Sequence, residues 1–501
     1  MSAMPKITEI SKCRWFTPAM VTLIFIPLLF LNIRHDHDWG GDFAQYMAQA
    51  DNIVHFRAME NTGYVYNEAF PSLAPKAYPP GFPLIIAPVT AIFGNAIPPY
   101  NYLISLFLIA TAVTTVLLLQ KKAGIWAAIA LSIIIYYNPY LVKFKSEVMA
   151  DIPFSFLVAV FVSMVHKQES LSGRRWIFAG LIAGYAAATK TAGASLLAAL
   201  MIYSLQQMIS SFISEKKIRK AIGMASGPMK GLAAGIGLSV VFSLLFLHSD
   251  KGSLSYLNTF SFSNILSSVS LNIFGYAEVI RYFFAGAAAP SHWVAALAGS
   301  AMIIFFITGL FLSFTQKPGV LEWTTLVYFG VLFIYPYQNS GFRFLIPIVP
   351  LMLYYIIHTA TSLKNARGGT LIAVFTMVMM CIQYFPMLND LQHSTQTIQE
   401  GPYKSNVVSA FRQIQSLTPE NALIVFKKPL VLARYTGRQS MSHTPDASVK
   451  QLQEQFNQKE ASYFLLYSGL PDEALENYLK NQSKNMALVW IDQDFKLYQK
   501  K

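Results

Sequence analysis

Five short segments of this sequence combine acidic or basic residues with glycines, prolines and apolar runs, and each could supply chemistry. In the first segment, Asp42 precedes a run from Phe43 to about Phe56 whose apolar residues have helical spacing. This spacing predicts an amphipathic helix along a membrane surface, with Asp42 at its N-cap. A carboxylate at this place could also act as a general base. The local sequence leaves both roles open.

Three further segments supply cations. Lys76 and Tyr78 lie within Pro75–Pro83, where the density of prolines predicts a rigid turn that could position both side chains. Lys190 ends a stretch rich in glycine and alanine, and it could equally be a lysine that snorkels to the membrane surface. Arg343 precedes an apolar run that contains two prolines.

A pair of acids stands at the start of another apolar run. Glu147 and Asp151 are four residues apart, so both would lie on one face of a helix. Carboxylates at membrane depth are costly, which makes a functional role the default hypothesis. The alternative for Glu147 is an ion pair with Lys143.

Apolar runs predict the elements that position these residues. Of the 501 residues, 54% are hydrophobic and only 13% are charged, and the mean hydropathy is +0.41. A soluble domain carries about a quarter charged residues, and a membrane helix needs roughly 20 apolar residues. We predict about eleven spans: Phe16–Ile33, Tyr102–Leu119, Ile125–Tyr137, Ile152–Val165, Trp176–Thr189, Ala194–Phe212, Leu232–Leu247, Trp293–Phe314, Leu321–Tyr335, Phe344–Ile357 and Leu371–Phe385.

Loop charges predict the orientation of these spans. Basic residues are concentrated in one alternating set of connections, which includes residues 1–15 and 214–230. The positive-inside rule places this set in the cytoplasm and explains the net charge of +13 without nucleic acid. The N-terminus is then cytoplasmic in the cytoplasmic (inner) membrane. The long loops 34–100 and 249–292 and the C-terminal part lie outside.

The end of the chain has a different pattern. From about Leu388 onward, polar sequence alternates with short apolar segments, as in a small α/β domain. Within it we predict strands over residues 421–426, 461–467 and 486–492 and helices over residues 428–437, 449–457 and 473–481. We predict a transmembrane domain over residues 1–390 and a soluble extracytoplasmic domain over residues 391–501. The fold class is therefore a polytopic α-helical membrane protein with a small C-terminal α/β domain. This α/β domain has no catalytic motif, and it could recognise acceptors, cover a site or be structural.

Taken in order, these motifs resemble the GT-C class of membrane glycosyltransferases. The similar branch contains the protein O-mannosyltransferases and the bacterial aminoarabinose transferase. The resemblance covers most of residues 15–390, and it departs at Phe43, where many relatives have a second acid. The motifs that carry it are Gly41-Asp42, Tyr78-Pro-Pro-Gly-Phe-Pro, Ser146-Glu147 with Asp151-Ile-Pro, Thr189-Lys-Thr-Ala-Gly and Arg343-Phe-Leu-Ile-Pro-Ile-Val-Pro.

This resemblance implies an inverting transfer of a hexosyl or pentosyl group from a polyprenyl-phosphate carrier. The acceptor would be a lipid, glycan or protein at the outer membrane surface. Asp42 would be the base, while Glu147 and Asp151 would orient the acceptor, bind the sugar or hold a cation. The residues expected to bind the donor and its phosphate are Lys76, Tyr78, Lys190 and Arg343.

Metal dependence stays open in this scheme. The cluster His35-Asp36-His37-Asp38 has side chains that could hold a metal, but alternating residues in a loop are weak evidence for one. Arginine and lysine alone can stabilise a leaving phosphate, so a divalent metal is compatible with the chemistry but not required.

Two other function classes compete with a transferase. A lipid-linked-sugar transporter or flippase would place binding groups near the bilayer midplane and often shows internal repeats. Here the charges lie at the outer boundary, and no convincing repeat is present. In a non-catalytic envelope-polysaccharide assembly protein, Asp42 would be only a helix cap.

Overall fold

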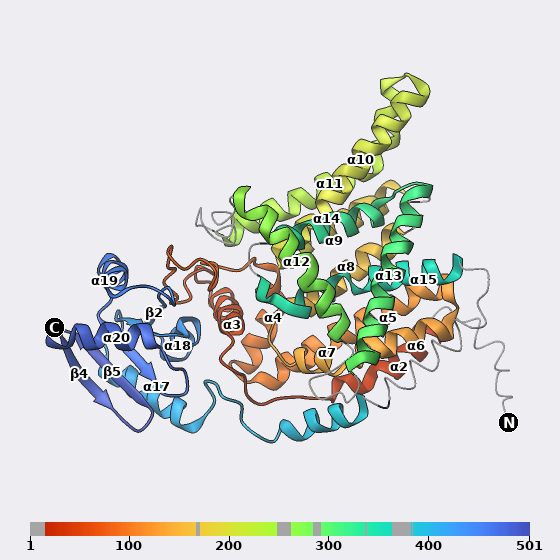
Figure 1. The fold of residues 1–501 in the computed structure, drawn as a ribbon. Coiled ribbons are helices and arrows are strands. Elements are labelled where there is room, and N and C mark those ends of the chain that lie inside the picture. Colours follow the sequence, from red (N-terminus) through yellow and green to blue (C-terminus); the bar gives the residue numbers. More distant parts are fainter. Residues whose placement is uncertain are drawn as a thin grey trace.

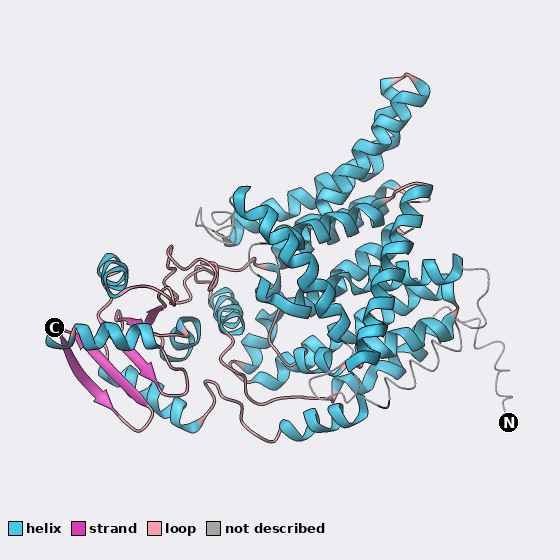
Figure 2. Cartoon of the chain, viewed as in Figure 1, coloured by secondary structure: helices cyan, strands magenta, loops and turns pink. Residues whose placement is uncertain are grey.

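A computed structural model describes residues 16–166, 171–247, 262–283, 292–335, 338–362 and 384–501, together with residue 382. A large helical body leads into a small domain that contains a sheet, at the left of Figure 1. Within the described residues, all named strands belong to this C-terminal part, as Figure 2 shows. The predicted fold class is therefore confirmed.

The helical body contains four helices long and apolar enough to cross a membrane, by length and composition, over Ile97–Ala123, Thr191–Ser214, Ile218–Phe246 and Ala296–Gln316. Six shorter apolar helices accompany them in the described part of the chain. The bounds of the helices in this body are α2 Phe16–Phe25, η1 Ile26–Leu29, α5 Ile97–Ala123, α6 Ile125–Tyr136, α8 Asp151–Val165, α9 Gly173–Thr189, α10 Ala194–Glu215, α11 Ile218–Phe246, α13 His292–Gln316, α14 Val320–Ile334 and α15 Val349–Ser362.

Two predicted connections differ from the structure. The expected cytoplasmic loop 214–230 is mostly helical, because α10 and α11 meet at Lys216 and Lys217 and project from the body (Figure 1). The expected loop 249–292 contains the helix α12, Phe262–Phe283. Most of the predicted span Leu371–Phe385 lies outside the described residues.

Glycines allow α9 to pack closely on α11. A Cβ atom added to Gly180 would lie 1.8 Å from the carbonyl oxygen of Gly231, and one added to Gly184 would lie 2.3 Å from that of Gly235. Small residues four positions apart permit such close approach of membrane helices. The contact fixes α9, whose C-terminal end carries Lys190.

Short helices and turns lie between the spans where the candidate residues are found. They are α3 Gly41–Val54, α4 Gly81–Phe93, α7 Pro139–Phe144, η3 Thr191–Gly193, η5 Gln338–Phe344 and η6 Ile346–Ile348. The helix predicted after Asp42 exists as α3, but nine of its fourteen residues are buried. It is therefore not a helix with one free polar face, because α4 and the C-terminal domain both pack against it.

The C-terminal domain is a five-stranded sheet with the strand order β2-β1-β3-β5-β4. Strand β1 pairs in parallel with β2 and β3, whereas β5 pairs antiparallel with β3 and β4. Prediction located β1, β3, β4, α18, α19 and α20, but missed α17, β2 and β5. The bounds are α17 Ser405–Leu417, β1 Leu423–Val425, α18 Pro429–Thr436, β2 Gln439–Met441, α19 Val449–Gln458, β3 Tyr463–Tyr467, α20 Glu473–Asn481, η7 Ser483–Asn485, β4 Met486–Ile491 and β5 Phe495–Lys500.

The segment around Asp42 is attached to this domain in two ways. Tyr64 forms a parallel bridge with Ser440 of β2, the edge strand, so the first long loop extends the sheet. Trp39, only 6% exposed, packs against Phe426 and Tyr467, which lie at the carboxyl ends of β1 and β3. The domain therefore holds the chain directly before Asp42.

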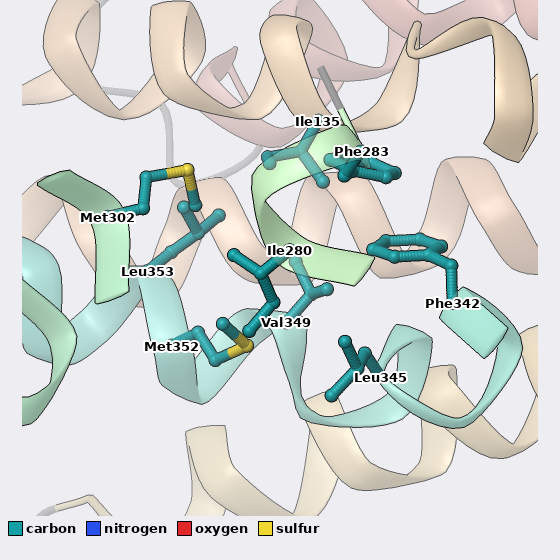
Figure 3. A pocket seen from close by; sticks show the side chains of 9 residues that line it. All are labelled: Ile135, Ile280, Phe283, Met302, Phe342, Leu345, Val349, Met352 and Leu353. Carbon is teal, nitrogen blue, oxygen red and sulfur yellow. The ribbon is translucent and has the colours of Figure 1, made fainter. Parts of the chain in front are cut away.

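A small apolar cavity lies where α12, α13 and α15 meet (Figure 3). It has a volume of about 20 Å³ and is lined by aliphatic, aromatic and methionine side chains, including Ile280, Met302 and Leu353. A cavity of this size and polarity stays dry, because a buried water needs polar partners. It is a packing gap and not a substrate site.

Candidate functional site

Asp42 lies in the first turn of α3 but does not cap it. The N-cap residue is Gly40, whose amide donates to Oδ1 of Asp38. Oδ1 of Asp42 instead accepts a 2.7 Å hydrogen bond from the hydroxyl of Tyr78. The predicted N-cap role is wrong, because the helix begins earlier and the Asp42 carboxylate points to another segment.

Arg343 contacts the other oxygen of this carboxylate. Its Nη2 lies 3.0 Å from Oδ2 of Asp42, and the two side chains are 32% and 21% exposed. Burial opposes the charged guanidinium, but the charges of Asp42 and Asp151 outweigh this effect and raise the pKa of Arg343. Both Asp42 oxygens thus have donors, while the side chain keeps access to solvent.

A second ion pair lies beside the first. The ammonium of Lys190 donates to Oδ1 of Asp151, a carboxylate that is only 3% exposed. The ring of Phe344 lies under both cations, with its centroid 4.4 Å from Nζ of Lys190 and 5.2 Å from Cζ of Arg343. The site therefore contains two carboxylates and two cations, which balance in charge.

Rigid contacts hold Tyr78 in place. Its ring stacks on Tyr46 of α3 with a centroid distance of 4.4 Å, and its backbone exchanges two hydrogen bonds with the side chain of Gln49. Gly81 follows, and a Cβ atom there would lie 2.6 Å from Oγ1 of Thr189. The proline-rich turn therefore fits against the end of α9, which carries Lys190.

The structure brings five of the seven sequence-predicted site residues together, but it leaves Glu147 apart. Glu147 precedes α8, so it does not share a helical face with Asp151 as predicted. Its Oε2 lies 3.0 Å from Nε2 of His37, and the suggested pair with Lys143 is not formed. The prediction that Glu147 and Asp151 share one face of a helix is wrong because the chain turns between Lys145 and Ala150.

Lys76 is the other residue outside the cluster. Its backbone carbonyl accepts a hydrogen bond from Gln45, but its half-buried ammonium has no hydrogen bond or ion pair with any residue that the structure describes. The rigid turn thus orients Tyr78 toward Asp42 and leaves Lys76 free.

His37 links three segments near the site. Its Nδ1 lies 3.1 Å from Oδ1 of Asp38, its Nε2 faces Glu147, and its ring stacks on Phe43 at 3.6 Å. Burial opposes the charged imidazole, but hydrogen bonds to Asp38 and Glu147 raise the pKa of His37 to about 9. Ligand atoms of these three residues lie within 4.8 Å of one another, a spacing that could hold a metal. Because the carboxylates contact opposite ring nitrogens, the observed arrangement fits a protonated imidazole better.

The C-terminal domain brings one further cation to the site, which no sequence motif marks. Lys428 directly precedes α18, and the side chain of Leu430 in this helix packs on Gly41, next to Asp42. Burial lowers the pKa of Lys428, while the charges of Asp38 and Asp42 act in the opposite direction. Lys428 is half-buried and forms no ion pair within the described part of the chain.

Comparison with known families gives a match over part of this region. The family of dolichyl-phosphate-mannose-protein mannosyltransferases matches residues 77–227, which include Tyr78, Asp151 and Lys190. No curated protein matches the sequence significantly.

Solved structures match nearly the whole chain. ArnT from Cupriavidus metallidurans, bound to undecaprenyl phosphate, is 11% identical with a TM-score of 0.58, over 97% of this chain and 98% of that one. The oligosaccharyltransferase AglB from Archaeoglobus fulgidus, in complex with an inhibitory peptide and a dolichol-phosphate, is 12% identical with a TM-score of 0.53. That match covers 90% of this chain and 68% of AglB. The family resemblance predicted from the motifs is thereby confirmed.

Proposed function

Since this multi-pass membrane protein has the fold of GT-C glycosyltransferases and resembles their protein mannosyltransferase branch, we propose that it is an inverting glycosyltransferase. It moves a hexosyl or pentosyl group from a polyprenyl-phosphate carrier to a lipid, glycan or protein acceptor. The observation that carries this proposal is the Asp42 carboxylate, partly exposed and held by Tyr78 and Arg343. Such an oriented carboxylate can serve as a general base beside a cation.

In the proposed reaction, Asp42 removes the proton from the acceptor hydroxyl. The acceptor oxygen forms a bond to the anomeric carbon as the bond from this carbon to the phosphate oxygen breaks. The lipid phosphate leaves with the bonding electron pair, so the configuration at the anomeric carbon is inverted. Asp151, held by Lys190, would orient the sugar or the acceptor.

Cations must stabilise the charge that grows on the leaving phosphate. Arg343 and Lys190 are within the cluster, but their charges are already balanced by Asp42 and Asp151. A bound phosphate therefore needs further positive charge. Lys76 and Lys428 are half-buried and lack ion pairs in the described residues, so they are suited to supply it.

The proposed orientation follows from the loop charges. The N-terminus would be cytoplasmic, and the site and the soluble domain of residues 391–501 would lie outside the cytoplasmic membrane. Trp39 and Lys428 support a working contact between that domain and the transmembrane domain of residues 1–390. A reporter fused after Lys501 should be active only outside, and a cytoplasmic signal would contradict the orientation.

The proposed activity is tested with the purified full-length protein. Polyprenyl-phosphate hexoses and pentoses are offered with a membrane lipid extract, a glycan or a peptide, and released polyprenyl phosphate is measured. We expect Asp42→Asn to reduce release by about 10²–10⁴-fold. Asp446→Asn, at an exposed position of the C-terminal domain, is the control. Undiminished release by Asp42→Asn would exclude Asp42 as the base.

A further inference from the structure

A second cavity, apart from the Asp42 site, lies where three separate segments meet. Its volume is about 490 Å³, which is within the size range of small-molecule sites. It is bounded by the chain after η1, by α7 and by the helical segment 384–394 with the residues that follow it. Its lining residues include Arg34, Lys143, Glu147, Met387, Asp390 and Leu391.

This cavity lies where three segments of the chain leave the predicted membrane helices. Asn32 and Arg34 follow the first apolar helix, and Pro139 and Lys143 follow the short apolar helix α6. The segment 384–394 contains the end of the last predicted span and the residues that follow it. All three segments leave the membrane on the same side in the proposed topology. The cavity therefore lies at the level where lipid headgroups meet water.

Two of the charged groups around the cavity are already neutralised. Nε of Arg34 lies 2.7 Å from Oδ1 of Asp36, and Glu147 pairs with His37. Arg34 also donates to the backbone carbonyls of Ser394 and Thr397, so it stabilises the wall. These groups are not free to bind a charged ligand.

The other two charges are free. Lys143 and Asp390 are exposed, and neither forms an ion pair or a side-chain hydrogen bond with a residue in the described ranges. They line the same cavity and carry opposite signs. Beside them, Tyr140, Met387 and Leu391 provide an apolar surface.

We propose that this cavity binds a zwitterionic phospholipid with a primary ammonium, such as phosphatidylethanolamine. Lys143 contacts the phosphate, Asp390 accepts hydrogen bonds from the ammonium, and the acyl chains lie along Met387 and Leu391. A lipid with only negative charge meets the repulsion of Asp390, so the site selects against it. This binding site does not depend on the proposed transferase activity.

Competitive lipid binding tests the assignment without any sugar transfer. Purified full-length protein is mixed with equal amounts of dioleoyl-phosphatidylethanolamine and dioleoyl-phosphatidylglycerol, and the bound lipids are measured by native mass spectrometry. We expect phosphatidylethanolamine to be retained in about two- to fivefold excess, as for a partly exposed charge pair. Equal retention, or an excess of phosphatidylglycerol, would overturn the proposal.

Two variants separate the roles of the charges. Asp390→Asn should bring the retention of the two lipids to about equal levels, because the repulsion and the ammonium contact are both lost. Lys143→Met should weaken retention of both lipids by about two- to fivefold. Lys450→Met, an exposed lysine of α19, is the control and should match the wild type. A wild-type lipid ratio in Asp390→Asn, or wild-type retention in Lys143→Met, would contradict the site.

Discussion

Nη2 of Arg343 lies 3.0 Å from Oδ2 of Asp42, although the two residues are 301 positions apart in the chain. The same guanidinium is close enough to Asp151 for that carboxylate to contribute to the raised pKa of Arg343. Arg343 therefore joins the two acids of the site. In the proposed reaction Asp42 is neutralised when it takes up a proton. The guanidinium of Arg343 can then stabilise the leaving phosphate instead.

This relationship predicts that Arg343→Lys is not a neutral change. A lysine keeps the charge but loses the planar group that can contact a carboxylate and a phosphate at once. We expect polyprenyl phosphate release to fall by about 10²–10³-fold, mainly in kcat. Arg412→Lys, at an exposed position of α17, is the control. Unchanged kcat in Arg343→Lys would show that only a point charge is needed there.

His37 and its two carboxylate partners, Asp38 and Glu147, predict that the stability of the fold depends on pH. Because the pKa of His37 is raised from 6.5 to about 9, its ion pairs stabilise the fold fully below pH 6.5. This contribution is lost as the pH rises through 9. Asp38 is half-exposed, so we expect a loss of about 2 kcal/mol, seen as a lower Tm at pH 9.5 than at pH 6.

Asp38→Asn provides the matched comparison for this pH effect, since it removes the charge of one partner of His37 and keeps the shape and an acceptor oxygen. The fall in Tm between pH 6 and pH 9.5 should be smaller in this variant. Equal falls in variant and wild type would mean that His37 does not carry the pH dependence.

Part of the site could be predicted from the sequence because local patterns mark it. Asp42, Asp151, Lys190 and Arg343 each stand where a loop meets an apolar run, and the helical body brings these boundaries together. The partner of Glu147 could not be predicted in this way. Its contact with His37 depends on how two loops pack, 110 positions apart, and no spacing rule describes that packing.

The contacts of the C-terminal domain with the site could not be predicted from local sequence either. Short apolar runs between polar stretches predicted its strands β1, β3 and β4, and β1 and β3 are almost completely buried. Nothing in the local sequence marked Trp39 as an anchor for this domain or Lys428 as a neighbour of Asp42. Both follow from the docking of α18 on α3, which is a property of the tertiary structure.

The placement of Lys428 predicts a role in binding the donor phosphate. Lys428→Met should raise the KM for the polyprenyl-phosphate sugar by about two- to fivefold, the usual range for a partly exposed charge. The kcat should change less, because Lys428 does not contact Asp42 directly. Lys428→Arg should restore most of the affinity.

Lys427→Met is the closest control for this prediction. Lys427 is the adjacent residue, but its ammonium donates to the carbonyl of Pro471 within the C-terminal domain. Its removal should leave the KM unchanged. Equal effects of both variants would indicate a general effect of surface charge, which higher salt would then also reproduce.

Trp39 predicts a test of whether the C-terminal domain positions Asp42. Its ring packs within 6.0 Å of Phe426 and 5.6 Å of Tyr467, measured between ring centroids, and replacing such a buried side chain costs about 3–5 kcal/mol. Trp39→Ala should therefore loosen the domain, so that limited proteolysis cuts near residue 400 sooner and transfer is slower. Trp126→Ala, at a position 73% exposed on α6, is the control. Faster proteolysis with unchanged transfer would mean that the docked domain does not hold Asp42 in its working position.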